Sequence, residues 1–404
     1  MATGQPLITL DEARALLLAD VAPVAAERVP IADGGGRTLA ADVVAGRDQP
    51  PDPVSAMDGF AVRASDAVAG ATLKVIGNAP AGRPFAGSVT AGTTVRIATG
   101  GVVPDGAERI VVQEIVERDG DSIRLIEAPG APTYVRPRGC DFSNGETIAR
   151  SGDLLTPARI GLAAAANLAT IEVRARPRVL ILASGDELRE PGSELGPGLI
   201  VNSAAYALAG LVEAWGGIAV RAPILSDDHD RCRAQIEEAG LDADIVVPLG
   251  GASVGDRDVL RPVIEGLGAR LLFDRIAVQP GKPCWHARFD GAALVLGLPG
   301  NPASAFVCAH LLLQPLLIAL LGRSNDTLVH AILTTPMPKG GSREVYWRAA
   351  HDPDGEGRLM VTPDPRLDSS FQVPLAAANA LIRRMPGAGP AKAGDLVEIV
   401  RLTL

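Results

Sequence analysis

Aromatic residues are scarce in this chain, since Phe, Trp and Tyr together make up 3% of its 404 residues. Platforms for single-stranded nucleic acids are built from such side chains, so their scarcity argues against that function. Positive charge is also in deficit, because 38 Lys and Arg stand against 47 Asp and Glu and leave a formal net charge of −9. Acidic chains bind phosphate backbones poorly. We therefore expect no nucleic-acid partner, although a local basic pocket for a small anion is compatible with this charge.

Cysteine is rare and dispersed. None of the four cysteines forms a CxxC pair, which argues against a zinc site and against a disulfide framework (Cys140, Cys232, Cys284 and Cys308). The first eleven residues lack the basic region and apolar core of a signal peptide. These two observations together lead us to expect a cytoplasmic protein with reduced thiols.

Several signatures of common enzyme classes are missing as well. The five histidines are scattered and give no Ser/His/Asp order, which argues against a hydrolase triad. The glycine-rich segment 250–255 matches neither G-x-G-x-x-G nor a P-loop, so a dinucleotide or Walker-type site is not indicated. The most apolar run, 303–321, is interrupted by Ser304, His310 and Pro315, which predicts a buried helix and no membrane span.

The length and the local patterns predict several domains. A T-x-x-E capping box at Thr9 predicts a helix to about Leu18. Short β-prone runs between Gly, Pro and Asp turns then indicate a mostly β module. We predict an N-terminal helical and linker region (residues 1–30 and 142–176), the mostly β module (31–141), an α/β domain (177–324) and a small C-terminal β domain resembling a barrel (325–404).

The α/β domain has the pattern of a doubly wound fold. Short apolar runs at Val179–Ala183, Ile245–Leu249 and Ala293–Leu298 alternate with helical segments. Apolar strands alternating with helices are typical of a parallel sheet that is covered on both faces. The fold class is therefore multidomain α/β plus β, with a central doubly wound domain.

Loops rich in glycine and carboxylates follow three of these runs. They are Ser184–Glu187, Gly250–Asp258 and Pro299–Pro302. Ligands of open parallel sheets bind beyond the carboxyl ends of the strands. Glycines permit close backbone approach, backbone N–H groups bind anions, and carboxylates suit a hard cation. Each loop alone could be an ordinary tight turn, but the three together favour a small anionic ligand bound with Mg²⁺.

Other segments are ambiguous when taken singly. Lys282, within Gln279–Pro283, suits a point contact to phosphate or another oxyanion. Asn301 followed by Pro302 is a helix N-cap pattern. Three turn-like segments lie outside the α/β domain (Ser55–Ala61, Thr99–Gly101 and Arg136–Asp141).

Taken in order along the chain, these segments resemble a known family. The order is Ser55–Ala61, Thr99–Ala107, Arg138–Asp141, Ser184–Leu188, Gly250–Asp258, Pro280–Pro283 and Leu298–Pro302. It resembles MoeA-type molybdopterin molybdenumtransferases, the bacterial relatives of the gephyrin E domain. The similarity extends over essentially the whole chain.

The resemblance implies an elongated four-part homodimer whose α/β domain binds molybdopterin. Such enzymes insert molybdate into adenylylated molybdopterin and release AMP, with Mg²⁺ as cofactor. It also implies an active site where the α/β domain of one subunit faces the β module of the other. Other proteins of molybdenum cofactor synthesis are then possible partners.

The resemblance implies roles for individual residues. The implied catalytic residues are Asp58, Asp141, Glu187, Asp227, Asp258 and Lys282. Among them Glu187, Asp227 and Asp258 are the Mg²⁺ ligands, Lys282 contacts the bound anion, and Asp58 reaches in from the partner subunit. The implied substrate-binding residues are Thr99, Arg136, Ser184, Gly185, Asp186, Gly250, Gly251, Ser253, Gly255, Pro299, Gly300, Asn301, Pro302 and Ser370.

Four positions depart from the family pattern. Ser184 replaces a usual Thr, Gly101 a usual Ala, Cys140 a polar residue, and Gln279 a residue that is often Lys. The last change removes a cation, and the sequence leaves open whether Arg275 supplies it. Alternatives to the transferase are a non-catalytic pterin-binding scaffold, a tungstate-specific version of the enzyme, and an unrelated nucleotide-binding α/β enzyme.

Overall fold

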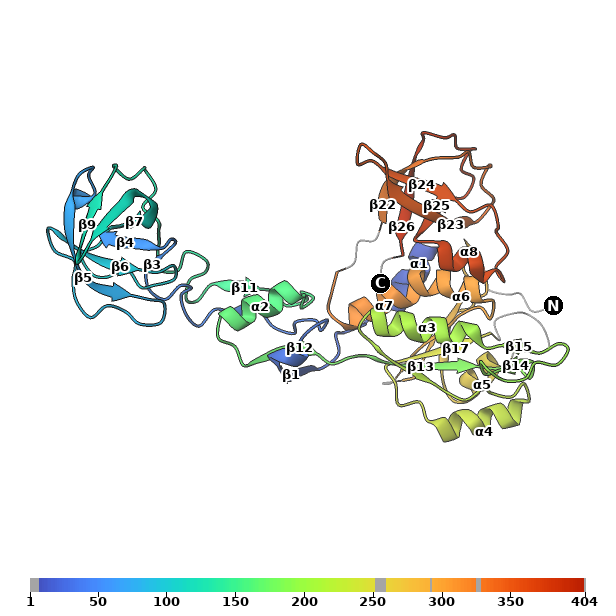
Figure 1. Ribbon diagram of the computed structural model, residues 1–404. Helices are drawn as coiled ribbons and strands as arrows, with labels where there is room; N and C mark the ends of the chain where they lie inside the picture. Colours follow the sequence, from blue (N-terminus) through green and yellow to red (C-terminus); the bar gives the residue numbers. More distant parts are fainter. Residues whose placement is uncertain (1–6, 251–258, 291–292, 325–327, 403–404) are drawn as a thin grey trace. The chain divides into compact units, whose positions relative to one another are not determined.

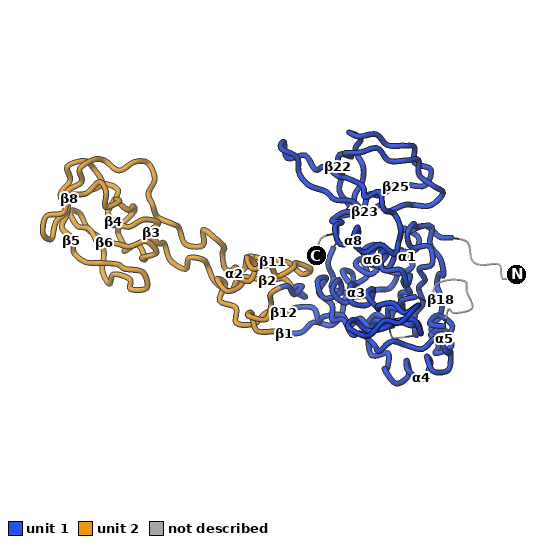
Figure 2. The backbone as a smooth tube through the Cα atoms, turned by 45° about the vertical axis from the view of Figure 1, so that its right-hand side comes forward, with its two compact units in different colours: residues 1–27, 36–40, 173–404 blue, residues 28–35, 41–172 orange. Residues whose placement is uncertain are grey.

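The computed structural model describes residues 7–250, 259–290, 293–324 and 328–402. The chain forms two compact units, coloured separately in Figure 2. Unit 1 comprises residues 1–27, 36–40 and 173–404, and unit 2 comprises residues 28–35 and 41–172.

Unit 1 contains a six-stranded sheet at the centre of the predicted α/β domain. Its strand order is β16 (Ile218–Arg221), β13 (Arg178–Ala183), β17 (Ile245–Leu249), β21 (Leu294–Gly297), β20 (Trp285–Arg288) and β18 (Arg270–Phe273). The first four strands are parallel, as predicted. Strand β20 runs antiparallel to both of its neighbours, β21 and β18, a feature absent from the sequence prediction. Only residues 289–293 separate β20 from β21, which is too short for the crossover that a parallel pair requires.

Helices cover both faces of this sheet (Figure 1). One face carries α1 (Leu10–Leu18), α3 (Ser203–Ala214), α6 (Pro302–Cys308) and α7 (Gln314–Leu320), and the other carries α4 (His229–Ala239) and α5 (Leu260–Gly266). Alternate residues of β13 enter different cores: Ile181 packs in the first cluster, and Leu180 and Leu182 pack in the second. The continuous apolar sequence of β13 therefore reflects burial on both sides.

Helix α1 begins at the predicted capping box. The Thr9 backbone N–H donates to Glu12 Oε2 at 2.7 Å, and the Glu12 N–H donates to Thr9 Oγ1 at 3.2 Å. Leu10 and Leu17 are fully buried in the first core cluster and hold α1 against the α/β domain.

The apolar run after Asn301 is a core helix. Helices α6 and α7 are joined by a π-helical turn, Ala309–Leu313, and form one segment, Pro302–Leu320. This segment is long and apolar enough to cross a membrane, but most of it is buried inside unit 1. The predicted buried helix is therefore confirmed.

A closed five-stranded barrel forms the C-terminal part of unit 1. Its strands are β22 (Leu328–Leu333), β23 (Glu344–Pro353), β24 (Leu359–Pro363), β25 (Ala380–Arg384) and β26 (Leu396–Arg401), and β23 pairs with both β24 and β25. The short strand β19 (Val278–Gln279) pairs with β23 in parallel. This pairing joins the α/β domain to the barrel, and α8 (Gln372–Ala377) lies in the connection between β24 and β25.

Unit 2 is mostly β structure, as predicted. Its main sheet has the order β7 (Arg109–Val112), β4 (Gly59–Val62), β6 (Thr93–Ile97), β5 (Thr72–Ala79), β9 (Ser122–Leu125) and β8 (Val116–Asp119). Two smaller pairings are β3 (Val54–Ser55) with β10 (Val135–Arg136), and β2 (Val43–Val44) with β11 (Thr147–Ala149). Helix α2 (Pro157–Ala165) begins after Thr156, whose hydroxyl oxygen accepts a hydrogen bond from the Arg159 backbone N–H. Strands β1 (Ala26–Pro30) and β12 (Thr170–Arg174) form a further pair.

A separate short pair belongs to unit 1, where β14 (Leu188–Arg189) pairs with β15 (Ile200–Val201).

Candidate functional site

A cavity of about 760 Å³ lies at the carboxyl ends of β13, β17 and β21. Because the ends of parallel strands meet at one sheet edge, three loops far apart in sequence line the same space. Two further predicted site residues come from the loop between β16 and α4 (Asp227) and from the barrel (Ser370). The predicted site residues that line the cavity are Ser184, Gly185, Glu187, Asp227, Gly250, Pro299, Gly300, Asn301, Pro302 and Ser370. Every residue lining this cavity belongs to unit 1. We call it the acidic cavity, after Glu187 and Asp227.

The glycines of these loops allow close packing around the acidic cavity. Gly185 has φ +153°, and a Cβ on it would lie 2.7 Å from Glu187 Oε2, so glycine lets the Glu187 carboxylate fold back over the turn. A Cβ on Gly300 would lie 3.3 Å from the Cα of Gly250. The β17 and β21 loops therefore approach each other backbone to backbone.

Two aspartates brace each other beside this cavity. The Asp186 N–H donates to Asp227 Oδ2 at 3.1 Å, and the Asp227 N–H donates to Asp186 Oδ1 at 3.4 Å. Asp227 lines the acidic cavity, whereas Asp186 does not. Asp186 therefore fixes the orientation of Asp227. Asp227 Oδ1 accepts no hydrogen bond from the described residues, so it can bind a ligand.

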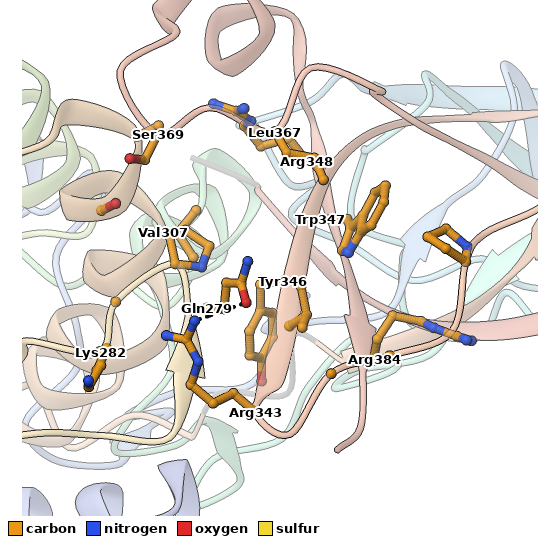
Figure 3. Close-up of a pocket in the computed structure, with 18 of the residues that line it drawn as sticks. Gln279, Lys282, Val307, Arg343, Tyr346, Trp347, Arg348, Leu367, Ser369 and Arg384 are labelled. Carbon is orange, nitrogen blue, oxygen red and sulfur yellow. Dashed lines mark hydrogen bonds between the residues drawn. The ribbon is translucent and has the colours of Figure 1, made fainter. Parts of the chain in front are cut away.

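A second cavity, of about 440 Å³, adjoins the first at Pro283, which lines both. Five cationic side chains line it (Lys282, Lys339, Arg343, Arg348 and Arg384). No Asp or Glu of the described part of the chain is among its lining residues. We call it the basic cavity, and Figure 3 shows it in close-up. A concave, cationic site without carboxylates is suited to a small anion.

A loop of the barrel borders both cavities. Asn301 Nδ2 donates to Ser369 Oγ at 2.9 Å, and the Ala303 N–H donates to the Ser369 carbonyl oxygen at 3.2 Å. Gln372 Nε2 donates to Ser203 Oγ at 2.9 Å. These bonds place Ser370 at the acidic cavity and Ser369 at the basic cavity.

Asn301 differs in part from its sequence prediction. It occupies the N-cap position of α6 and Pro302 follows in the first turn, as the pattern predicts. Its side chain does not cap its own helix, however, and bonds to Ser369 of the barrel instead. A tertiary partner has therefore displaced the local one.

In unit 2 the structure brings Asp58 and Thr99 together. The Thr99 N–H and Oγ1–H both donate to Asp58 Oδ1, at 2.7 and 2.9 Å. These two hydrogen bonds stabilise the carboxylate and lower the pKa of Asp58. Arg136 lies in β10 and Asp141 follows it in a turn, and both are exposed. Among the described residues, neither of these two side chains makes a hydrogen bond or ion pair with another.

Some predicted residues cannot be placed. Gly251, Ser253, Gly255 and Asp258 lie outside the described residues. Within the described ranges, no three His, Cys, Asp or Glu side chains are grouped as a metal would require. The proposed Mg²⁺ ligands that the structure places are thus Glu187 and Asp227, both at the acidic cavity.

The barrel supplies functional candidates that the sequence prediction missed. Lys339, Arg343, Arg348 and Arg384 line the basic cavity with Lys282, but only Lys282 belongs to a recognisable motif. Arg275, the suggested substitute for the missing cation, forms an ion pair with Asp274 at 3.6 Å and does not line this cavity. The pairing of β19 with β23, which has no local sequence signal, brings the barrel arginines here.

Three family models match this chain in succession. They are the MoeA N-terminal region (domain I and II) over residues 8–167, a probable molybdopterin binding domain over 180–319, and the MoeA C-terminal region (domain IV) over 330–402. Together they extend over most of both compact units.

Curated relatives and solved structures agree with these matches. The molybdopterin molybdenumtransferase of Haemophilus influenzae is 31% identical over 97% of this chain and 98% of its own length. Molybdopterin molybdenumtransferase 2 of Mycobacterium tuberculosis is 33% identical over 93% of this chain and 95% of its own. The molybdopterin biosynthesis protein moeA of Pyrococcus horikoshii OT3 superposes with a TM-score of 0.83 at 28% identity, and covers 98% of this chain and 100% of its own. The chain therefore belongs to the MoeA family of molybdopterin molybdenumtransferases.

Proposed function

We propose that this chain inserts molybdate into adenylylated molybdopterin and releases AMP, as a step of molybdenum cofactor biosynthesis. The observation that carries the proposal is the adjoining pair of cavities in unit 1. One holds Glu187 and Asp227 at the sheet edge, and the other is lined by five cations. This arrangement suits a reaction between one large phosphorylated substrate and one small anion.

The acidic cavity suits the pterin nucleotide. Its volume of about 760 Å³ lies within the range of pockets that enclose cofactor-sized ligands. Gly185, Gly250 and Gly300 keep its walls free of side chains, so backbone N–H groups can approach phosphate oxygens. Ser184, Asn301 and Ser370 add hydroxyl and amide groups for the polar edges of the ligand.

The basic cavity suits molybdate. Molybdate is a compact dianion, and cationic side chains without competing carboxylates would bind it. Pro283 lines both cavities and Lys282 lines the basic cavity, so a bound oxyanion would lie beside the pterin nucleotide. This juxtaposition brings the reactants together, which is a large part of the catalytic advantage in a bimolecular step.

Mg²⁺ fits the donor set of the acidic cavity. Glu187 and Asp227 offer carboxylate oxygens, the ligands that Mg²⁺ prefers, and Asp258 is a further candidate from the family resemblance. Two carboxylates beside a pyrophosphate would repel it, and a bound cation would neutralise this charge. The role of the chain itself is to hold Asp227 in place through Asp186, and to orient water at the phosphorus from which AMP leaves.

We further propose a cytoplasmic homodimer in which unit 2 of one subunit completes the site of the other. The Asp58 and Thr99 pair is the part of unit 2 that supports this, because it presents a fixed carboxylate on an exposed turn. No residue of unit 2 lines the acidic cavity of the described chain. In a symmetric dimer such a contribution would occur twice.

The experiment supplies the purified protein with adenylylated molybdopterin, molybdate and Mg²⁺, and quantifies AMP. The transferase requires AMP release that depends on molybdate and on Mg²⁺. A scaffold would bind the pterin nucleotide and release no AMP, which would contradict the proposal. A parallel series with tungstate in place of molybdate tests for a tungstate-specific enzyme, which would release AMP with tungstate and not with molybdate.

A further inference from the structure

We propose that Asn202, at the start of α3, binds a phosphoryl group of the pterin nucleotide in the acidic cavity. The backbone N–H groups in the first turn of α3 complete this phosphate subsite. The inference rests on the proposed function and adds a residue that lies outside the segments carrying the family resemblance. It follows from a side-chain amide that is buried at the cavity wall and has no partner in the described part of the protein.

The backbone of Asn202 is fixed by the same short strand pairing that holds Glu187. Strand β15 leads directly into α3 and pairs in parallel with β14, with Leu188 opposite Ile200 (Figure 1). The Ile200 N–H donates to the Glu187 carbonyl oxygen at 2.9 Å, and the Asn202 N–H donates to the Arg189 carbonyl oxygen at 2.9 Å. The start of α3 and the Glu187 loop are therefore held together where they line the acidic cavity.

The Asn202 side chain is buried but unpartnered. It is 5% exposed, and it lines the acidic cavity. An asparagine at an N-cap usually accepts a hydrogen bond from the second or third N–H of its helix. Asn202 makes no such bond, and within the described ranges its amide bonds to no other group. Buried polar groups are nearly always hydrogen-bonded in native proteins, so a ligand in the cavity is the partner that can satisfy this amide.

Helix α3 supplies backbone donors beside this amide. Ser203 and Ala204 also line the acidic cavity, and their N–H groups donate to no acceptor among the described residues. The first N–H groups of a helix have no partner inside it, and they carry the positive end of the helix dipole. The Ser203 hydroxyl is already engaged, because its Oγ accepts from Gln372 Nε2 at 2.9 Å. What remains at this end of the cavity is a set of N–H donors that suits an anion.

A phosphoryl group fits these donors better than the other polar parts of the ligand. The Asn202 amide has two N–H donors, and the first turn of α3 adds backbone donors next to it in the chain. A phosphoryl group presents several charged oxygens to such a set, whereas the edge of a pterin ring alternates donors with acceptors and would leave some of them unpaired. The carboxylates of Glu187 and Asp227 are left to the Mg²⁺ that accompanies the pyrophosphate.

The test measures dissociation constants by anaerobic equilibrium dialysis, with the full-length protein and Mg²⁺. The probes form two pairs, molybdopterin with its phosphatase-treated form, and AMP with adenosine. Asn202→Ala should weaken the phosphorylated member of at least one pair about tenfold or more, as expected for loss of a hydrogen bond to a charged group. Binding of the member without phosphate should stay nearly unchanged. The pair that responds identifies which phosphoryl group of the nucleotide occupies the subsite.

Asn202→Asp separates this role from a structural one. Asp and Asn are about equally good N-caps, so a capping role predicts wild-type binding for Asn202→Asp and a defect for Asn202→Ala. A phosphate contact predicts the reverse order, because Asp replaces two donors with a negative charge. Asn202→Asp should therefore weaken the phosphorylated probe more than Asn202→Ala does. Both variants should unfold like the wild type, since the side chain makes no bond within the described protein.

The matched control is Asn144→Asp, at an exposed position of unit 2 that lines neither cavity. It should bind all four probes like the wild type. Three results would each overturn the inference: no weakening in either pair, equal weakening with and without phosphate, or wild-type binding by Asn202→Asp. These are binding measurements, so they decide the role of Asn202 even if the wild type releases no AMP, a result that would refute the proposed function instead.

Discussion

The sulfur of Cys308 fills the space in which a side chain at Gly281 would begin. A Cβ on Gly281 would overlap Cys308 Sγ, and Gly281 has φ +128°, a conformation that other residues rarely adopt. The Cys308 Sγ–H also donates to the Pro280 carbonyl at 3.7 Å. The turn that presents Lys282 is thus held directly on α6, and both glycine and the buried thiol are needed for its shape.

Gly281→Ala should therefore reduce both stability and molybdate use. The left-handed strain and the overlap together predict a loss of about 2–4 kcal/mol in unfolding free energy. The displaced turn should raise the half-saturating molybdate concentration, and Cys308→Ala in the same chain should relieve part of the overlap. Denaturant unfolding and the AMP assay check this.

Gly210→Ala is the control, because Gly210 lies in α3 and a Cβ built on it has nothing within 4 Å. This change should be neutral or slightly stabilising. If Gly281→Ala and Gly210→Ala had the same unfolding free energy and the same half-saturating molybdate concentration, this explanation of the turn would be contradicted.

Removing either carboxylate of the acidic cavity should abolish turnover without unfolding the protein. Glu187→Gln and Asp227→Asn keep the shape of each side chain, and the expected loss in the rate of AMP release is at least about a hundredfold, as for loss of a transition-state charge contact. Both variants should unfold like the wild type, because neither change leaves a large cavity.

Two exposed residues nearby serve as controls for these variants. Glu194→Gln and Asp230→Asn remove the same charge outside the acidic cavity and should retain normal rates. If Asp227→Asn turned over normally, the assignment of Asp227 as a metal ligand would be wrong.

Mild acid should destabilise unit 1 through two buried histidines. Burial lowers the pKa of His286 and of His310 to about 4 in each case, against an ordinary value of 6.5. The unfolded chain therefore binds these protons first as the pH falls. The destabilisation is absent above about pH 6.5 and grows down to about pH 4, and at pH 5 it should amount to about 2 kcal/mol for each histidine.

Tryptophan fluorescence measures this effect selectively, because all three tryptophans (Trp215, Trp285 and Trp347) lie in unit 1. Denaturant midpoints at pH 7.5 and pH 5 should differ in the wild type. His310→Phe removes one titrating ring, whose Nε2 is buried without a partner among the described residues, and should reduce the difference by about half. Carboxylates with lowered pKa, such as Glu213, remain ionised at both pH 7.5 and pH 5. An unchanged pH difference in His310→Phe would contradict the prediction.

A site shared between subunits predicts complementation between two inactive variants. Glu187→Gln affects unit 1, and Asp58→Asn affects unit 2 and removes the carboxylate that accepts both Thr99 bonds. A heterodimer of the two has one site with both changes and one with neither. Equal mixing after subunit exchange should therefore restore about one quarter of wild-type activity. Each variant mixed with itself is the control, and a mixture as inactive as its parents would argue that each subunit works alone.

The sequence predicts the acidic cavity better than the basic one, for a physical reason. Glu187 follows an apolar strand of a parallel sheet, and the ends of such strands converge by topology. The basic cavity depends on Arg343 and Arg348, which meet Lys282 only because β19 pairs with β23. That pairing is a long-range register with no local pattern.

A local sequence pattern also fails to predict a side-chain hydrogen bond where a residue from a distant part of the chain competes for the same group. The Asn301 amide bonds to Ser369 of the barrel, although its position favours capping α6. The antiparallel edge of the central sheet was likewise not evident, because the short apolar runs give no indication of strand direction. The contact between Asp58 and Thr99 was also not predicted from the sequence, and it forms because their turns lie beside each other at the end of β3.

The central claim is that this chain couples AMP release to the capture of molybdenum, and the stoichiometry of a single turnover tests it most directly. Protein in excess over adenylylated molybdopterin is mixed with Mg²⁺ and molybdate, and AMP and pterin-bound molybdenum are quantified over time. Coupled release and capture should give equal amounts of both products, formed at the same rate, and no AMP when molybdate is left out. AMP released equally without molybdate, or with no molybdenum retained on the pterin, would contradict it.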